Sequence, residues 1–348
     1  MDPVLSVAST SVGVISPSTA HTLSFIFTTS YVGSLYLSQI LFSSSPTKSR
    51  SASPKVQDGN PPVIPPIDDI QVNGETGIER GPKRGSRDHP ETIKRRMTAV
   101  TISTSLSLAG VYLTINNISQ KPLLSLGTGS GLGQSMTVLG LRLPTFKAGL
   151  WGLVGPWVLA PILVTGPLLA MFLDGELPII GNRYHGESVT QRIGRGWREL
   201  GLIELRNYGV GPITEELVFR STILSVSILG GLSFKSLVFG TPLWFGIAHA
   251  HHALETFRKQ GSTKQAAIQA VLGCLFQLSY TTLFGWFASY LFLRAGSVIP
   301  PLTSHIFCNV MGIYLPSTAI HRHQEKKALI WGSYIAGIIG FIWGVRKI

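Results

Sequence analysis

Two adjacent glutamates and an arginine lie within an apolar stretch of this chain. The segment TEELVFRSTILSVSIL, residues 214–229, places Glu215, Glu216 and Arg220 among residues that a lipid bilayer would accept. Ionisable side chains inside apolar spans are expensive to bury and usually line a cavity or a pathway. Such a segment is typical of a buried site that performs chemistry.

The spacing of these residues predicts different roles for the two glutamates. Residues four apart share one face of a helix, so we expect Glu216 and Arg220 to face each other as an ion pair. Glu215 lies about 100° further round the helix and points elsewhere. It is thus left as the unpaired acid, which can serve as a general base.

A second interpretation of the same residues involves no catalysis. The residues GVGPITEE are typical of a helix start, with Pro212 in the first turn. Glu215 and Glu216 would then lie near the positive end of the helix dipole and cap a helix at the membrane interface. This segment alone leaves both interpretations open.

Two further apolar stretches carry polar residues of complementary chemistry. The stretch LWFGIAHAHH, residues 243–252, contains Phe245 and His249, and PPLTSHIFCNVMGIYL, residues 300–315, contains His305 and Asn309. His305 and Asn309 are four apart and share a helix face. A single buried histidine is commonly a satisfied core residue, but three separate stretches with such groups predict one shared site.

The set of residues points to activation of a water molecule. The sequence contains no Gly-x-Ser-x-Gly elbow and no phosphate-binding loop, and neither of its two cysteines has a catalytic setting. Glu215 with His249 could deprotonate a water, while His305 and Asn309 donate hydrogen bonds to an oxyanion. A zinc ion held by Glu215, His249 and His305 is an open alternative, although His-Glu-x-x-His and its inverted form are absent. Both versions predict amide hydrolysis within the membrane.

The composition is that of an integral membrane protein. Of the 348 residues, 44% are hydrophobic and only 13% are charged, whereas soluble domains carry about 25% charged residues. The first apolar stretch has no basic segment before it, so we expect no cleaved signal peptide. An all-α, polytopic fold with about eight transmembrane helices is predicted. The predicted spans lie near residues 22–42, 97–117, 148–173, 211–230, 234–250, 266–293, 298–317 and 328–345.

Composition divides the chain into three parts. Residues 1–42 hold the first predicted span, and residues 97–348 form a multi-span domain. Between them, residues 43–96 are rich in Ser, Pro, Gly and charge and are expected to be a disordered polar loop.

The net charge of +12 follows the membrane topology. Lys and Arg residues gather in alternate loops, as the positive-inside rule expects, so the charge does not indicate a nucleic-acid partner. The bias places four loops in the cytosol, at 43–96, 174–206, 250–265 and 318–327.

Three motifs, in this order, resemble those of the CAAX prenyl endopeptidase family of the Ras-converting enzyme type. They are Glu-Glu-x-x-x-Arg at 215–220, Phe-x-x-x-His at 245–249 and His-x-x-x-Asn at 305–309. The stretches FGIAHAHH and HIFCN are similar to the eukaryotic members in particular. The resemblance covers about residues 95–345.

This resemblance implies an endopeptidase that removes the last three residues of proteins prenylated on the CaaX cysteine, such as small GTPases. It implies a site in the endoplasmic reticulum membrane that is open to the cytosol, and chemistry without a metal or another cofactor. It assigns Glu215 and His249 to the catalytic water, and His305 and Asn309 to the oxyanion. The supporting positions of the motifs are Glu216, Arg220 and Phe245.

Two other functions are compatible with buried polar residues. A catalytically silent membrane scaffold of the same fold would be expected to lack a motif residue, and none is missing from this sequence. A transporter could use buried Glu and His as a proton relay, but it predicts internal repeats that the sequence does not show.

A basic segment at 182–207 directly precedes the glutamates. Its residues Arg192, Arg195 and Arg198 could attract the substrate's C-terminal carboxylate or lipid headgroups. An ordinary positive-inside loop explains these arginines equally well.

Overall fold

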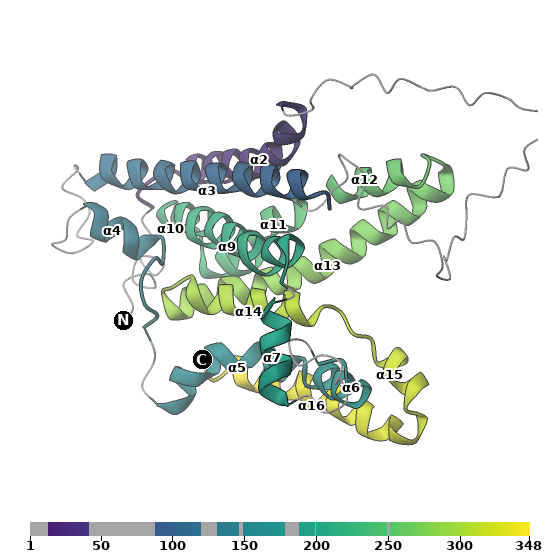
Figure 1. The fold of residues 1–348 in the computed structure, drawn as a ribbon. Helices are drawn as coiled ribbons and strands as arrows, with labels where there is room; N and C mark the ends of the chain where they lie inside the picture. The colour runs from purple at the N-terminus through teal and green to yellow at the C-terminus, as the bar shows by residue number, and fades with distance from the viewer. Residues whose placement is uncertain are drawn as a thin grey trace, which may run out of the picture.

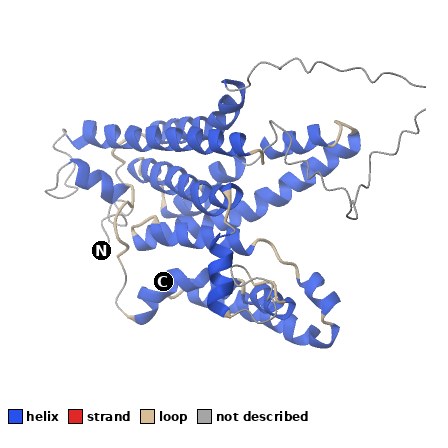
Figure 2. Ribbon diagram, viewed as in Figure 1, coloured by secondary structure: helices blue, strands red, loops and turns tan. Residues whose placement is uncertain are grey.

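A computed structural model provides the structure of the protein, and every regular element in its described part is a helix (Figure 2). The all-α prediction is therefore confirmed. The structure describes residues 13–41, 88–119, 131–145, 149–177, 188–198, 200–248 and 251–348.

The helices are arranged in layers (Figure 1). Helices α2 (Pro17–Leu41) and α3 (Pro90–Ser119) run side by side over the middle layer, and a hydrogen bond of 2.9 Å joins Ser30 Oγ to Ser103 Oγ between them. The middle layer carries the predicted site. It contains α9 (Gly211–Glu216), α10 (Ser225–Leu229), α11 (Pro242–Ala248), α13 (Lys264–Ala295) and α14 (Ile299–Met311).

The start of α3 differs from the prediction. This helix begins at Pro90, inside the range 43–96 that the sequence predicts as a disordered loop, and residues 42–87 lie outside the described part. Pro90 occupies the first helical position and Glu91 lies in the first turn, both favourable at a helix N-terminus. The first turns carry charge rather than apolar residues, so a hydropathy pattern starts the helix too late.

The segment that contains the glutamates is one continuous helical stretch from Leu202 to Leu229. Pro212 lacks an N–H and its ring crowds the preceding turn, yet the helix continues because a wider π turn comes first. Within that turn the Gly211 N–H bonds to the carbonyl of Arg206. The stretch consists of α8 (Leu202–Glu204), the π-helix η1 (Leu205–Val210), α9, the π-helix η2 (Leu217–Leu224) and α10.

This continuity decides between the two interpretations of the glutamates. The helical stretch begins well before Pro212, so Glu215 and Glu216 lie in its interior and not in its first turn. The capping interpretation is therefore wrong. π-Helical turns inside α-helices occur frequently at functional sites, and here one lies on each side of α9.

Helices α11 and α13 cross closely because glycines lie at the crossing. A Cβ atom on Gly285 would lie 2.6 Å from Cβ of Pro242, and one on Gly246 would lie 2.6 Å from the Leu278 side chain. Small residues permit such close approach between membrane helices. The crossing brings Phe245 of α11 and Phe284 of α13 against the same side chain, Arg220.

A third layer lies on the far side of α14 from α2 and α3 (Figure 1). At one end of this layer, Asp174 accepts hydrogen bonds from Tyr314, from Arg322 at 3.0 Å and from His323 at 2.8 Å. These bonds tie the end of α6 to the chain that follows α14. The layer contains α5 (Leu150–Leu163), α6 (Thr165–Asp174), α15 (Pro316–Arg322) and α16 (Lys327–Val345).

Three shorter helices lie outside these layers, and two small elements complete the described part. The helices are α4 (Gly131–Val138), α7 (Val189–Arg198) and α12 (His251–Lys259), and the small elements are the π-helix η3 (Ser236–Gly240) and the 3-10 turn η4 (Gln324–Lys326).

The described residues contain three helices that are long and apolar enough to cross a membrane, at Pro90–Asn117, Lys264–Ala295 and Gln324–Val345. The pair α5 and α6, bent by 56°, passes the same test when the two helices are taken together as one broken span, which would make four. Helix α14 has 13 residues and is about 20 Å long, which is shorter than the roughly 30 Å hydrocarbon core. The membrane class of the fold is confirmed, while the number of eight spans stays a prediction.

Candidate active site

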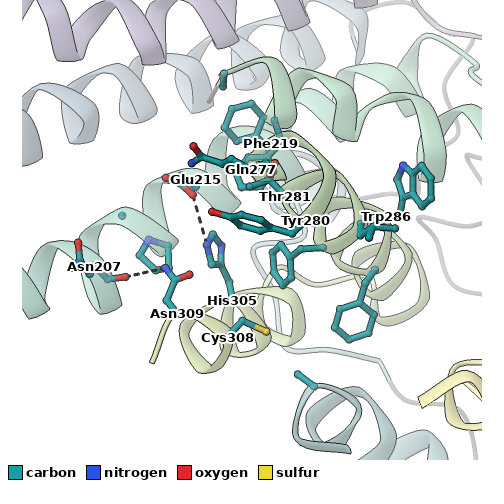
Figure 3. A pocket seen from close by; sticks show the side chains of 18 of the residues that line it. Asn207, Glu215, Phe219, Gln277, Tyr280, Thr281, Trp286, His305, Cys308 and Asn309 are labelled. Carbon is teal, nitrogen blue, oxygen red and sulfur yellow. Dashed lines mark hydrogen bonds and ion pairs between the residues drawn. The ribbon is translucent and has the colours of Figure 1, made fainter. Parts of the chain in front are cut away.

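A cavity of about 1240 Å³ opens between the layers and is lined by four residues of the predicted site. They are Glu215, Phe245, His305 and Asn309 (Figure 3). His249, the fourth residue that the sequence assigns to the water or the oxyanion, lies outside the described residues.

Behind the cavity wall, Glu216 and Arg220 form the ion pair that their spacing predicts. Arg220 Nη1 lies 3.0 Å from Glu216 Oε1, and the two side chains are 1% and 0% exposed. The guanidinium also lies 4.8 Å from the ring centre of Phe245 and 5.6 Å from that of Phe284. Such cation–π contacts are stronger when water is excluded, so the aromatic rings contribute to holding the buried charge.

His305 joins this buried pair to Glu215. Its Nδ1 lies 2.7 Å from Glu216 Oε1, and its Nε2 lies 3.6 Å from Glu215 Oε2. The same Glu216 oxygen accepts the hydrogen bond from Arg220, so we assign it as the acceptor for His305 as well, with the proton on Nδ1. The second nitrogen then lies on the Glu215 side, where it is too far from the carboxylate for a direct hydrogen bond.

The two glutamates differ in exposure in the way that their predicted roles require. Glu215 is 24% exposed and lines the cavity, while Glu216 is fully buried. Glu215 can therefore meet a substrate and a water, and Glu216 can reach only its protein partners. The spacing argument separated the two residues correctly, although it did not predict that His305 lies close to both.

Asn309 lies one helical turn beyond His305 and contacts the chain just before α9. Its Nδ2 donates a hydrogen bond of 2.9 Å to the backbone carbonyl of Asn207 in η1. Asn207 was not among the predicted residues, because the sequence before Pro212 was interpreted as a loop. This bond fixes the side-chain amide of Asn309 at the edge of the cavity (Figure 3).

Sequence reasoning also missed the contribution of α13. This helix lines the cavity with Gln277, Tyr280 and Thr281, which lie near Glu215 in Figure 3. The only signal in the sequence is the polar stretch QLSYTT, residues 277–282, inside an otherwise apolar span.

The cavity is polar on one side and apolar on the other. Asn207, Glu215 and Asn309 lie at the polar side, and Trp286 lies away from them (Figure 3). The apolar lining continues through Phe239, Phe287, Phe341 and Val345. A ligand that fills such a cavity combines a polar reacting group with a long apolar portion.

Within the described residues, no three His, Cys, Asp or Glu side chains are grouped as metal ligands. His305 Nδ1 is already engaged by Glu216, which leaves only its Nε2 available to a ligand. The zinc arrangement of Glu215, His249 and His305 includes a residue outside the described part, so the choice between the metal and metal-free versions stays a prediction.

Comparison with known proteins identifies the family. The family model described as type II CAAX prenyl endopeptidase Rce1-like matches residues 199–311, which contain all three motifs. A CAAX prenyl protease 2 of Homo sapiens is 34% identical over 261 residues, which is 72% of this chain and 70% of the relative. This chain belongs to the CAAX prenyl endopeptidase family. The resemblance drawn from the motifs is confirmed.

Other relatives of the family align over different shares of the chain. A probable CAAX prenyl protease 2 of Schizosaccharomyces pombe is 41% identical over 145 residues, 41% of this chain and 52% of the relative. The CAAX prenyl protease 2 of Rattus norvegicus is 32% identical over 255 residues, 72% of this chain and 68% of the relative. No solved structure gives a significant match to the fold.

Proposed function

We propose that this CAAX prenyl endopeptidase removes the C-terminal aaX tripeptide from prenylated CaaX proteins, small GTPases among them. The observation that carries the proposal is Glu215, which is exposed to the cavity beside a histidine that the buried Glu216–Arg220 pair holds in place. The division of the cavity into polar and apolar sides matches a substrate with a peptide end and a lipid chain.

In the proposed reaction, Glu215 is the general base. Together with His249 it takes a proton from a water molecule, and the water oxygen attacks the carbonyl carbon of the prenylated cysteine. Glu215 then returns the proton to the leaving amine of the tripeptide. The peptide C–N bond breaks, and the cysteine becomes the new C-terminal carboxylate.

His305 and Asn309 stabilise the oxyanion that forms during the attack. Because His305 Nδ1 donates to Glu216, Nε2 can donate to the oxyanion only if the ring carries both protons. While the oxyanion exists, Glu215 holds the proton taken from water, so Glu216 and the oxyanion are the negative groups that face the two cations, Arg220 and His305. Asn309 uses one N–H of its amide on Asn207 and retains the second for the substrate.

We place the protein in the endoplasmic reticulum membrane, as the resemblance of its motifs implies. The charges on the loops support a cavity that is accessible from the cytosol. We propose three divisions of the chain: the N-terminal region 1–42, the polar loop 43–96 and the protease domain 97–348. Because α3 begins at Pro90, its first turns belong with the protease domain. The mechanism uses no metal and no other cofactor.

The test uses microsomes that contain the full-length protein and a farnesylated CaaX peptide. We expect mass spectrometry to detect the released tripeptide, and the same peptide without the farnesyl group to be cut far more slowly. If folded wild-type protein released no tripeptide, the scaffold function would replace this proposal. Equal cleavage of both peptides would contradict the role of the apolar side of the cavity.

A further inference from the structure

Two arginines line the cavity. Among the described residues that line the cavity, Arg96 of α3 and Arg206 of η1 are the ones with a basic Lys or Arg side chain. Arg206 directly precedes Asn207, whose carbonyl accepts the hydrogen bond from Asn309. Positive charge is therefore placed next to the backbone that positions a residue of the proposed oxyanion site.

Arg206 already binds a carboxylate of its own chain. Its Nη1 lies 3.0 Å from Asp88 Oδ1, and its Nε donates to Asn207 Oδ1 at 2.9 Å. The Arg206 side chain is 16% exposed, whereas that of Asp88 is 54% exposed. Such a solvated partner is held weakly, so a second carboxylate from the cavity can share or replace it on the guanidinium fork.

The position of Arg206 fits the length of the product tripeptide. Arg206 and Glu215 lie nine positions apart on one continuous helical stretch, which is about 13 Å of rise. Three extended residues span about 10 Å, and the arginine side chain adds its own reach. A peptide whose scissile bond lies at Glu215 can thus place its terminal carboxylate near Arg206.

We infer that Arg206 binds the free C-terminal carboxylate of the substrate, and that Asp88 competes with the substrate for this site. The inference rests on the proposed function, because it needs a substrate that ends three residues after the cleaved bond. The inference also moves the carboxylate site to Arg206 from the three arginines of segment 182–207 that the sequence suggested. The cavity lining includes Arg206 but not Arg192, Arg195 or Arg198.

The test compares one farnesylated CaaX peptide in two forms, with a free C-terminal acid and with a C-terminal amide. The full-length protein is assayed in membranes as wild type and as Arg206→Gln, Arg206→Lys and Asp88→Asn. Arg198→Gln is the matched control, because it removes the same charge from an exposed position on α7 that does not line the cavity.

We expect the wild type to cleave the acid at least about 10-fold better than the amide in kcat/KM, the effect of one charge-assisted hydrogen bond. Arg206→Gln should bring this ratio close to one, mainly by raising KM for the acid. Arg206→Lys should retain part of the ratio, since it keeps the charge without the fork. Asp88→Asn should lower KM for the acid, and Arg198→Gln should leave the ratio unchanged.

Three results would overturn the inference. A wild-type enzyme that cleaves acid and amide equally has no carboxylate site. If Arg206→Gln lowered cleavage of both peptides by the same factor, Arg206 would have only a structural role. If folded wild-type protein cleaved neither peptide, the proposed function itself would be rejected. That result is distinct from equal cleavage of both peptides, which rejects only the carboxylate site.

Discussion

The buried pair of Glu216 and Arg220 predicts that the two adjacent glutamates differ sharply in their contribution to stability. Replacing Glu216 by Gln removes the charge that compensates Arg220, a side chain that is only 1% exposed. Removal of one partner from a buried ion pair costs about 3–5 kcal/mol. Replacing Glu215 by Gln should cost less than about 1 kcal/mol, because that side chain is 24% exposed and lies 3.6 Å from His305.

Thermal unfolding of the purified protein in detergent measures this difference. Larger domains lose about 2 °C for each kcal/mol, so Glu216→Gln should lower the midpoint by about 6–10 °C and Glu215→Gln by about 2 °C or less. The double variant Glu216→Leu/Arg220→Met is the control, since it removes both charges and should recover much of the loss. A Glu216→Gln protein as stable as wild type, or a larger loss in Glu215→Gln, would refute the assignment of Glu216 as the structural partner.

Further predictions concern the crossing of α11 and α13, the hydrogen bonds to Asp174 and the dependence on metal. Gly285→Ala should reduce both stability and activity, because the new Cβ atom would lie 2.6 Å from Cβ of Pro242. Gly273→Ala on the same helix is the control. Its new Cβ atom meets nothing within 4 Å, so the variant should be neutral or slightly stabilising in the same thermal assay. Asp174→Ala should lower the unfolding midpoint by several degrees, since it removes the acceptor of Tyr314 and His323 and one of the two acceptors of Arg322. Glu176→Ala, which removes an exposed carboxylate, should change the midpoint little. A zinc chelator should leave tripeptide release unchanged, and loss of activity that zinc restores would favour the metal site.

The sequence was sufficient to predict contacts within one helix. Glu216 and Arg220 pair because they are four residues apart, and this spacing is fixed by the helix itself. The bond between His305 and Glu216 joins residues 89 positions apart, so it depends on how α9 and α14 pack. Motif order indicated that these stretches meet, but only the packing shows that one histidine contacts the buried glutamate and lies close to the exposed one.

Hydropathy was a good guide to the class of fold and a poor guide to the ends of helices. It missed the start of α3 at Pro90, where charged residues form the first turns. It also placed a helix start near Pro212, where a π turn lets the helix continue. The carbonyl of Asn207 and the polar residues of α13 were missed for a related reason, because ordinary polar residues in a helix carry no motif.

The role of Glu215 as the base that activates water is the central claim, and the rate of the chemical step in Glu215→Gln tests it most directly. The variant is first shown to unfold within about 2 °C of wild type, and single-turnover release of the tripeptide from a farnesylated CaaX peptide is then measured. The proposed mechanism predicts a rate about 10²–10⁴-fold lower than wild type, with little change in substrate binding. A Glu215→Gln enzyme that keeps more than about a tenth of the wild-type rate would contradict it.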